Sequence, residues 1–92
     1  MKYSLGEKID SMLVETLESA CAAAFAQKQE KGAYIQRAIR KLDMAKIFLQ
    51  IAWEMKSLDT AKYAAVSEKL DAIGRMLGGW HGQVIKQNSP TR

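Results

Sequence analysis

Large apolar residues in the last third of the chain recur at alternating steps of three and four. They fall at Tyr63, Val66, Leu70, Ile73, Leu77 and Trp80. This spacing is typical of an a/d seam, in which one edge of a helix packs against a neighbouring helix. Asp59 is a suitable N-cap, and the seam extends to Val84. The pattern therefore predicts a helix over residues 59–86.

Three glycines repeat every fourth residue along another edge of this helix, at Gly74, Gly78 and Gly82. Glycine inside a helix costs roughly 0.8–1 kcal/mol relative to alanine, so the repeat indicates that something approaches the backbone closely there. The alternative is that Gly78 and Gly79 cap the helix and leave Trp80 onward as a tail. We favour the continuous helix, because the seam continues beyond these glycines without an intervening proline.

A first helix is predicted over about residues 4–29. Ser4 and Glu7 have the spacing of a capping box, in which the serine oxygen accepts a hydrogen bond from the Glu7 amide. Gly32, at the end of the charged run KQEKG, marks the connection to the next helix. The apolar face of this first helix is predicted to be Leu5, Ile9, Leu13, Leu17, Ala20 and Ala24.

A second helix is predicted over residues 33–56, with two apolar stripes. The first stripe is Ile35, Ala38, Leu42, Ala45, Leu49 and Ala52, and the second is Met44, Phe48, Ile51 and Met55. A helix that is apolar on two faces needs more than one apolar neighbour. Either another chain or a fourth helix covers the second stripe, and we favour self-association. The candidate packing residues are Met44, Phe48, Ile51, Met55, Gly74, Gly78 and Trp80.

Together these patterns predict an all-α fold in one domain over residues 1–92. No proline interrupts the chain before Pro90, and no strand-like alternation competes with the helical periodicity. Short connections between three long helices predict an antiparallel, up-down bundle. Residues 87–92 are expected to form a disordered tail.

The sequence offers little that points to catalysis or to a membrane. It has no apolar run long enough to span a bilayer and no signal peptide pattern, so we expect a cytoplasmic protein. The single cysteine, Cys21, lies among small apolar residues and is expected to be a buried thiol. The single histidine, His81, has no second histidine or cysteine with which to share a metal. We expect no metal, no cofactor and no enzymatic activity.

Charge is distributed unevenly along a chain of net charge +4. Residues 4–26 carry four acids and one lysine, whereas residues 31–56 carry six bases and two acids. Arg37, Arg40 and Lys41 cluster within one helical turn, with Asp43 as the only nearby acid. Such a basic patch is compatible with binding to a phosphate backbone. The alternative is a solvated face that pairs with the acidic first helix of a neighbour, and charge alone favours this alternative.

Several segments resemble one family of small bacterial four-helix-bundle proteins. IGRMLGGW (73–80), preceded by SEKL (67–70), is similar to the C-terminal helix of that family. YSLGEKI (3–9) and LDMAKIFLQIAWEMKSL (42–58) are similar to its second and third helices. The family includes the accessory variability determinant (Avd) of diversity-generating retroelements and proteins encoded in rRNA intervening sequences. Only two residues precede YSLGEKI, so the chain resembles helices two to four of the pattern.

The resemblance implies a non-catalytic partner of a reverse transcriptase. Members of the retroelement branch form basic homopentamers that bind the polymerase and nucleic acid and support mutagenic copying of a template RNA into cDNA. Arg75 belongs to the matching motif, and with Arg37, Arg40 and Lys41 it is a candidate contact for RNA, DNA or the polymerase. The alternative is a structural homo-oligomer of the rRNA intervening-sequence type, without a retroelement role.

Overall fold

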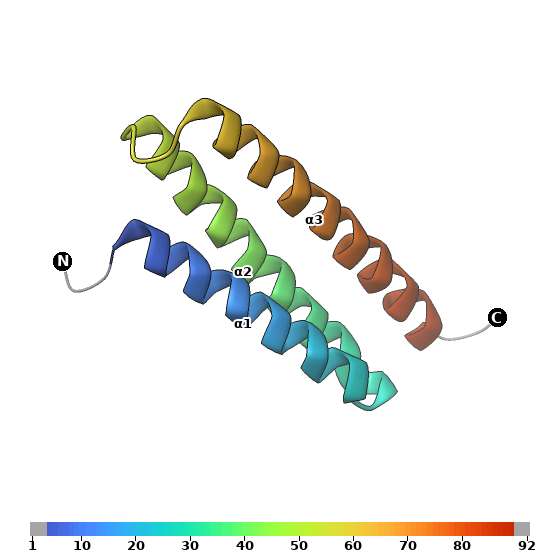
Figure 1. Ribbon diagram of the computed structural model, residues 1–92. Coiled ribbons are helices and arrows are strands. Elements are labelled where there is room, and N and C mark those ends of the chain that lie inside the picture. The colour runs from blue at the N-terminus through green and yellow to red at the C-terminus, as the bar shows by residue number, and fades with distance from the viewer. Residues whose placement is uncertain (1–3, 90–92) are drawn as a thin grey trace.

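The computed structural model describes residues 4–89 and is built from three helices. They are α1 (Leu5–Phe25), α2 (Lys28–Glu54) and α3 (Thr60–Asn88). No strand occurs within these residues, so the predicted all-α class is confirmed for the part that is described. α2 lies between the other two helices (Figure 1). None of the three helices has both the length and the apolar character needed to cross a membrane.

Side-chain caps begin α1 and α3 where the sequence predicted them. The Glu7 backbone N–H donates to Ser4 Oγ at 3.0 Å, and the Lys62 backbone N–H donates to Asp59 Oδ1 at 2.8 Å. Each bond satisfies one of the N–H groups that a helix leaves unpaired at its first turn. α3 continues through Gly78 and Gly79 to Asn88. The continuous helix is therefore confirmed, and the expected tail at 87–88 is wrong; residues 90–92 lie outside the described residues.

A tight turn ends α2 and leads into α3. Lys56 has a positive φ of 63°, and the Ser57 N–H donates to the Ala52 carbonyl at 2.9 Å. This pattern closes the last turn of a helix on a left-handed residue. The Trp53 ring then stacks on Tyr63 with centroids 4.7 Å apart, and its Nε1–H donates to Thr60 Oγ1 at 3.1 Å. The two helices are thus joined by both backbone and aromatic contacts.

The connection between α1 and α2 differs from the prediction. α1 ends at Phe25 rather than near Gln29, and α2 begins at Lys28 rather than Ala33. Lys31 Nζ donates to the carbonyls of Ala23 (2.8 Å) and Ala24 (3.1 Å), which satisfies acceptors that the end of α1 leaves unpaired. Gly32 is therefore not a helix breaker.

Gly32 lies inside α2 and faces the end of α3. A Cβ atom at this position would lie 3.7 Å from Ile85 Cδ1 and 3.9 Å from Val84 Cγ1. The start of α2 therefore packs against the last turns of α3. Asn88 Nδ2 also donates to the Lys28 carbonyl at 2.9 Å.

The predicted inner stripe of α2 forms the centre of the molecule. All six of its residues are buried: Ile35, Ala38, Leu42, Ala45, Leu49 and Ala52. α3 contributes Leu70, Leu77 and Val84 as buried residues, and Tyr63, Val66 and Trp80 pack against this core while half-buried. The a/d seam of α3 is therefore confirmed, except that Ile73 is exposed.

The face through which α1 packs on α2 matches the predicted one only in part: Ile9 is buried and Leu5, Leu13 and Ala20 pack against the core. Its buried residues are Ile9, Met12, Thr16, Ser19 and Ala23, whereas Leu17 is 65% exposed and Ala24 is also exposed. The Thr16 hydroxyl is satisfied within the helix, because it donates to the Met12 carbonyl at 2.8 Å. Small side chains on α1 meet the alanine-rich inner stripe of α2, so burial there favours small residues over Leu17.

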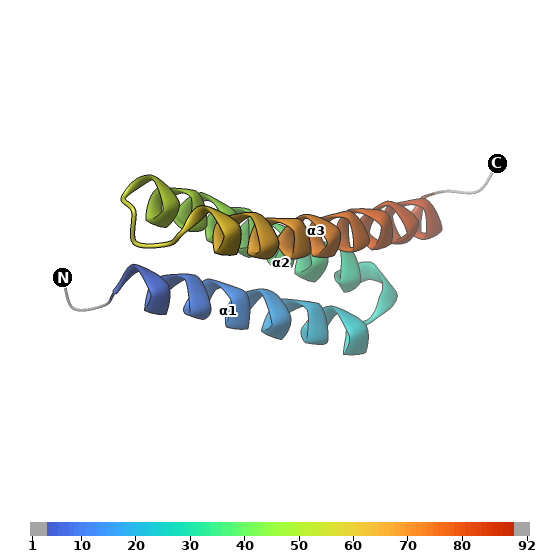
Figure 2. The same ribbon diagram turned by 45° about the horizontal axis from the view of Figure 1, so that its top comes forward.

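α1 and α3 both pack on α2 but do not approach each other. No Cα atom of α1 lies within 8 Å of a Cα atom of α3 among the described residues, and Figure 2 shows α1 and α3 separated from each other. The described chain measures 53 × 26 × 14 Å. A cavity of about 430 Å³ opens at one end between the two helices, with α2 as its floor. We call the space between these two helices the α1–α3 groove. It is lined by Leu5, Gly6, Ile9, Asp10, Leu13, Leu49, Ala52, Ser57, Leu58 and Val66.

Candidate nucleic-acid interface

The outer face of α2 is a continuous exposed stripe directed away from its buried stripe. It consists of Arg37, Arg40, Met44, Ile47 and Ile51, which recur at steps of three and four and so share one side of the helix. The first half of this face is cationic and the second half is apolar. The predicted second stripe of α2 is therefore exposed at Met44, Ile51 and Met55, whereas Phe48 is half-buried against the core.

Arg37 and Arg40 are the two cations of this outer face. Both are exposed, and neither forms an ion pair with any residue from 4 to 89. The Arg37 guanidinium carbon lies 5.5 Å from the centroid of the Tyr34 ring, a cation–π contact that holds the side chain against the helix. A planar guanidinium offers forked N–H donors that match the oxygens of a phosphate. These two side chains can therefore receive a polyanion.

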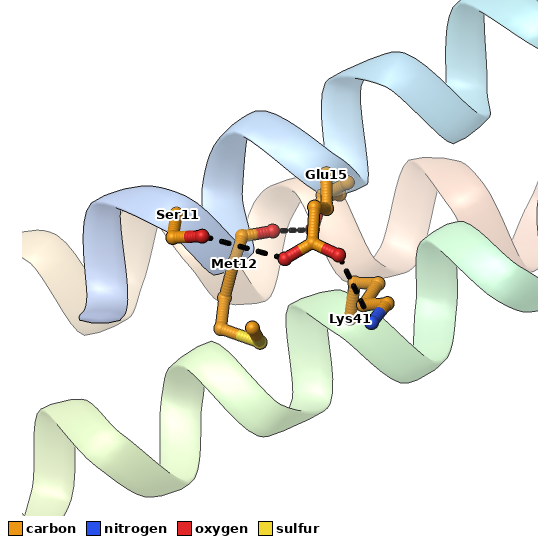
Figure 3. Close-up of polar contacts among 5 residues, drawn as sticks. Ser11, Met12, Glu15 and Lys41 are labelled. Atoms are coloured by element: carbon orange, nitrogen blue, oxygen red, sulfur yellow. Dashed lines mark hydrogen bonds and ion pairs between the residues drawn. The ribbon is translucent and has the colours of Figure 1, made fainter. Parts of the chain in front are cut away.

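Lys41 is directed toward α1 and is already paired. Its Nζ lies 3.1 Å from Glu15 Oε1, and Glu15 also accepts a hydrogen bond from Ser11 Oγ at 3.4 Å (Figure 3). The expectation that Asp43 is the only acid near the basic cluster is therefore wrong. The acidic helix that pairs with Lys41 belongs to the same chain, because α1 packs directly on α2.

Arg75, the fourth candidate, lies exposed on α3, a different helix from Arg37 and Arg40. Asp71 precedes Arg75 by four residues, a spacing that suits an ion pair on a helix, but the two do not pair. Asp71 Oδ1 instead lies 3.2 Å from Lys46 Nζ of α2. Arg75 forms no ion pair within the part of the chain that the structure describes.

A shallow hollow of about 250 Å³ lies beside Arg37 at the seam of α1 and α2. Glu15 and Glu18 line it together with Arg37 and Lys41. Two carboxylates in this position repel a phosphate chain, because like charges at short distance are unfavourable. A nucleic acid is therefore best placed along Arg40, with Arg37 at the edge of the seam, rather than in the hollow between α1 and α2.

Among the predicted packing glycines, only Gly74 faces another helix of this chain. A Cβ atom there would lie 3.5 Å from Leu42 Cδ2 and 3.2 Å from Lys46 Nζ. At Gly78 and Gly82 a Cβ atom would meet no neighbouring heavy atom within 4 Å. The close approach that the glycine repeat predicted is therefore limited to Gly74 within one chain. Trp80, the last predicted packing residue, is half-buried and packs against both parts of the core.

α1 carries an exposed apolar stripe that the sequence interpretation missed. Val14, Leu17 and Phe25 are all exposed, and Phe25 reaches 92%. Cys21 lies on the same side of α1 and is exposed too, so the prediction of a buried thiol is wrong. The helical spacing of these residues is the signal that could have found the stripe, but the prediction included only Leu17 and placed it on the face toward the core.

Comparison with known proteins gave no match: no family model, no curated protein and no solved structure is similar enough to place the chain in a family. The resemblance to the Avd family therefore stays a prediction. Within residues 4–89 no three His, Cys, Asp or Glu side chains are grouped so that they could hold a metal ion.

Proposed function

We propose that this protein is a non-catalytic accessory factor of a diversity-generating retroelement. It binds template RNA, or the cDNA copied from it, through the outer face of α2 and holds the nucleic acid near a reverse transcriptase. The observation that carries the proposal is the pair of exposed arginines, Arg37 and Arg40, which have no acidic partner among the described residues. Arg75 is a further contact that the family resemblance implies.

The proposal includes an antiparallel, up-down bundle that assembles into a homo-oligomer in the cytoplasm. Hydrogen bonding between Asn88 and Lys28 supports the antiparallel arrangement of α2 and α3. The exposed side chains of Met44, Ile47 and Ile51 support a contact with a protein, since apolar patches of this kind usually mark interaction sites. A reverse transcriptase is the protein that the resemblance implies, and the homopentamer stays a prediction from the same source.

A second candidate function is a purely structural homo-oligomer of the rRNA intervening-sequence type. The observation that favours it is the Lys41–Glu15 ion pair, which neutralises one of the three clustered cations within the chain. In that case Arg37 and Arg40 are solvated surface residues and bind no nucleic acid.

Binding of a single-stranded RNA oligonucleotide, measured by fluorescence anisotropy across a salt series, tests the proposal. The affinity should fall with salt at a log–log slope of about −0.7 for each phosphate neutralised. Arg37→Glu with Arg40→Glu should abolish binding. The matched control is Lys8→Glu with Lys86→Glu, which makes the same change in net charge at exposed positions on α1 and α3.

Equal loss of binding in both double variants would mean that only net charge matters and would contradict a site on α2. Binding that is absent in the wild-type protein at low salt would favour the structural candidate. The gene neighbourhood gives an independent check on the retroelement itself. A reverse-transcriptase gene with a template and variable repeat pair should lie beside the gene for this chain.

A further inference from the structure

The α1–α3 groove has the size and lining of a site for one more helix. Leu13 of α1 and Val66 of α3 form its walls at the described cavity, and helix spacing continues these walls through Leu17 on one side and Ile73 and Met76 on the other. Leu17 is 65% exposed and Met76 is 72% exposed. Two apolar helices that flank a third, with no Cα atoms within 8 Å of each other, leave one corner of a four-helix arrangement open.

α1 itself has the surface that suits this open corner. Val14, Leu17, Cys21 and Phe25 follow one another at steps of three, four and four, and all four are exposed. This stripe lies on the side of α1 opposite to the buried residues Thr16 and Ala23, which face α2. A helix that is apolar on opposite sides needs a second apolar neighbour.

Charge favours α3 of another copy as that neighbour. α1 carries four acids and one lysine, a net charge of −3. α3 carries four bases (Lys62, Lys69, Arg75 and Lys86) and two acids (Glu68 and Asp71), a net charge of +2. Complementary charge steers two surfaces together and suppresses other pairings. The groove also has a wall from α1, which carries the same net charge as its occupant, so the favourable charge pairing is the one with α3.

The two helices also match in level along the molecule. Ile9 of α1 and Val66 of α3 line the same end of the groove, and Ala23 and Val84 share one buried cluster at the other end. A two-fold axis parallel to the helices keeps these levels. With this axis, Leu17 of the second copy lies at the same position along the helix axis as Met76. Asp10 of the second copy likewise lies at the same position as Lys69.

We propose that the α1–α3 groove of one copy receives α1 of a second copy, and that the exchange is reciprocal about this two-fold axis. Each α1 stays on its own α2, so a closed dimer of six helices results. An isologous contact of this kind closes with two copies, whereas the family resemblance implies five.

The proposed dimer replaces the predicted homopentamer, but it is independent of the proposed nucleic-acid site because it uses none of the arginines on the outer face of α2. Analytical ultracentrifugation at micromolar concentration should give twice the chain mass of 10.3 kDa. Leu17→Glu and Met76→Glu should each give the mass of one chain with unchanged helical circular dichroism. Both positions are exposed in a single copy, so the substitutions leave its fold intact.

The matched control is Ile47→Glu, at a residue that is 57% exposed on the outer face of α2; it should retain the doubled mass. A wild-type mass of one chain, or of five, would overturn the proposal. So would a doubled mass that survives Leu17→Glu but is lost in Ile47→Glu. If Leu17→Glu has the mass of one chain but still binds RNA, the dimer and the nucleic-acid site are separate, and each can fail without the other.

A charge exchange tests the register of the two helices. Asp10→Lys and Lys69→Asp should each weaken the dimer, because each places like charges opposite one another. The double variant restores opposite charges and should regain the wild-type dissociation constant. If the double variant forms a weaker dimer than either single variant, the proposed axial register of α1 against α3 is excluded.

Discussion

The α1–α3 groove and the outer face of α2 expose apolar side chains to a similar degree, yet their shapes and charges differ. The groove is concave, with walls from two helices and a floor from a third. The outer face belongs to one helix and adds two unpaired arginines to its apolar half. A concave apolar surface fits a helix, whereas a convex surface with guanidinium groups fits a phosphate chain. Exposure alone does not distinguish the two uses, but geometry and charge do.

The largest effect is expected at the core that separates the two surfaces. Leu42 is 1% exposed and belongs to the main hydrophobic cluster. Leu42→Ala should lower the free energy of unfolding by about 2–5 kcal/mol, because it removes buried methyl groups and leaves a cavity. Ile47→Ala, on the outer face of the same helix, should change it by less than about 0.5 kcal/mol. Urea denaturation measures both, and similar losses would mean that the outer face is covered in solution.

The next largest effect is expected on the salt dependence of RNA binding, which tests whether the nucleic acid lies on the outer face of α2. Arg37→Gln with Arg40→Gln removes two phosphate contacts, so the salt slope of RNA binding should become shallower by about 1.4. Leu17→Glu, in the groove, should leave the slope unchanged. A slope that responds to the groove variant and not to the arginines would place the nucleic acid on the opposite surface.

A smaller effect is expected at two glycines that lie away from both surfaces. Gly32→Ala should raise the free energy of unfolding by about 0.5–1 kcal/mol, because alanine favours the helix and its Cβ would meet only ordinary contacts at 3.7 Å. The leucine side chain of Gly78→Leu would extend into open space in a single copy. The substitution should therefore leave the mass of the dimer unchanged. A reduced mass of the assembly would indicate that the interface between copies lies instead at the edge of α3 that carries Gly78.

The smallest effect on stability is expected at the Glu15–Lys41 ion pair. Glu15→Gln should lower the free energy of unfolding by less than about 1 kcal/mol, since both side chains are partly exposed. It also frees Lys41 next to Arg37 and should therefore strengthen RNA binding. Ser11→Ala, which removes only the hydrogen bond to Glu15, is the control and should leave RNA binding unchanged. Unchanged binding in both variants would support the structural candidate.

Periodicity predicted α2 and α3 well because the apolar residues of their buried faces recur regularly at helical spacing. All six residues of the inner stripe of α2 are buried, and the caps Ser4 and Asp59 make the hydrogen bonds that their types suggested. In these segments one physical preference, burial of the apolar stripe, agrees with the local helix signals. The predicted positions and the observed ones therefore coincide.

The face of α1 could not be predicted in this way because two apolar stripes compete. Met12, Thr16, Ser19 and Ala23 are buried, whereas the larger Leu17 is exposed. Close packing against an alanine-rich partner reverses the usual order, since small residues permit the contact. The pairing of Lys41 with Glu15 was hidden for the same reason, because it depends on which side of α1 meets α2.

The short turn between α1 and α2 limits how two copies of the chain can associate and dissociate. Only Ala26 and Gln27 separate the two helices, and Lys31 ties the start of α2 to the carbonyls that end α1. With so short a hinge, α1 cannot swing out to cross into another molecule while its own hairpin stays folded. Subunits should therefore exchange by dissociation and re-association of folded chains. Two differently labelled preparations should then exchange subunits without an unfolded intermediate.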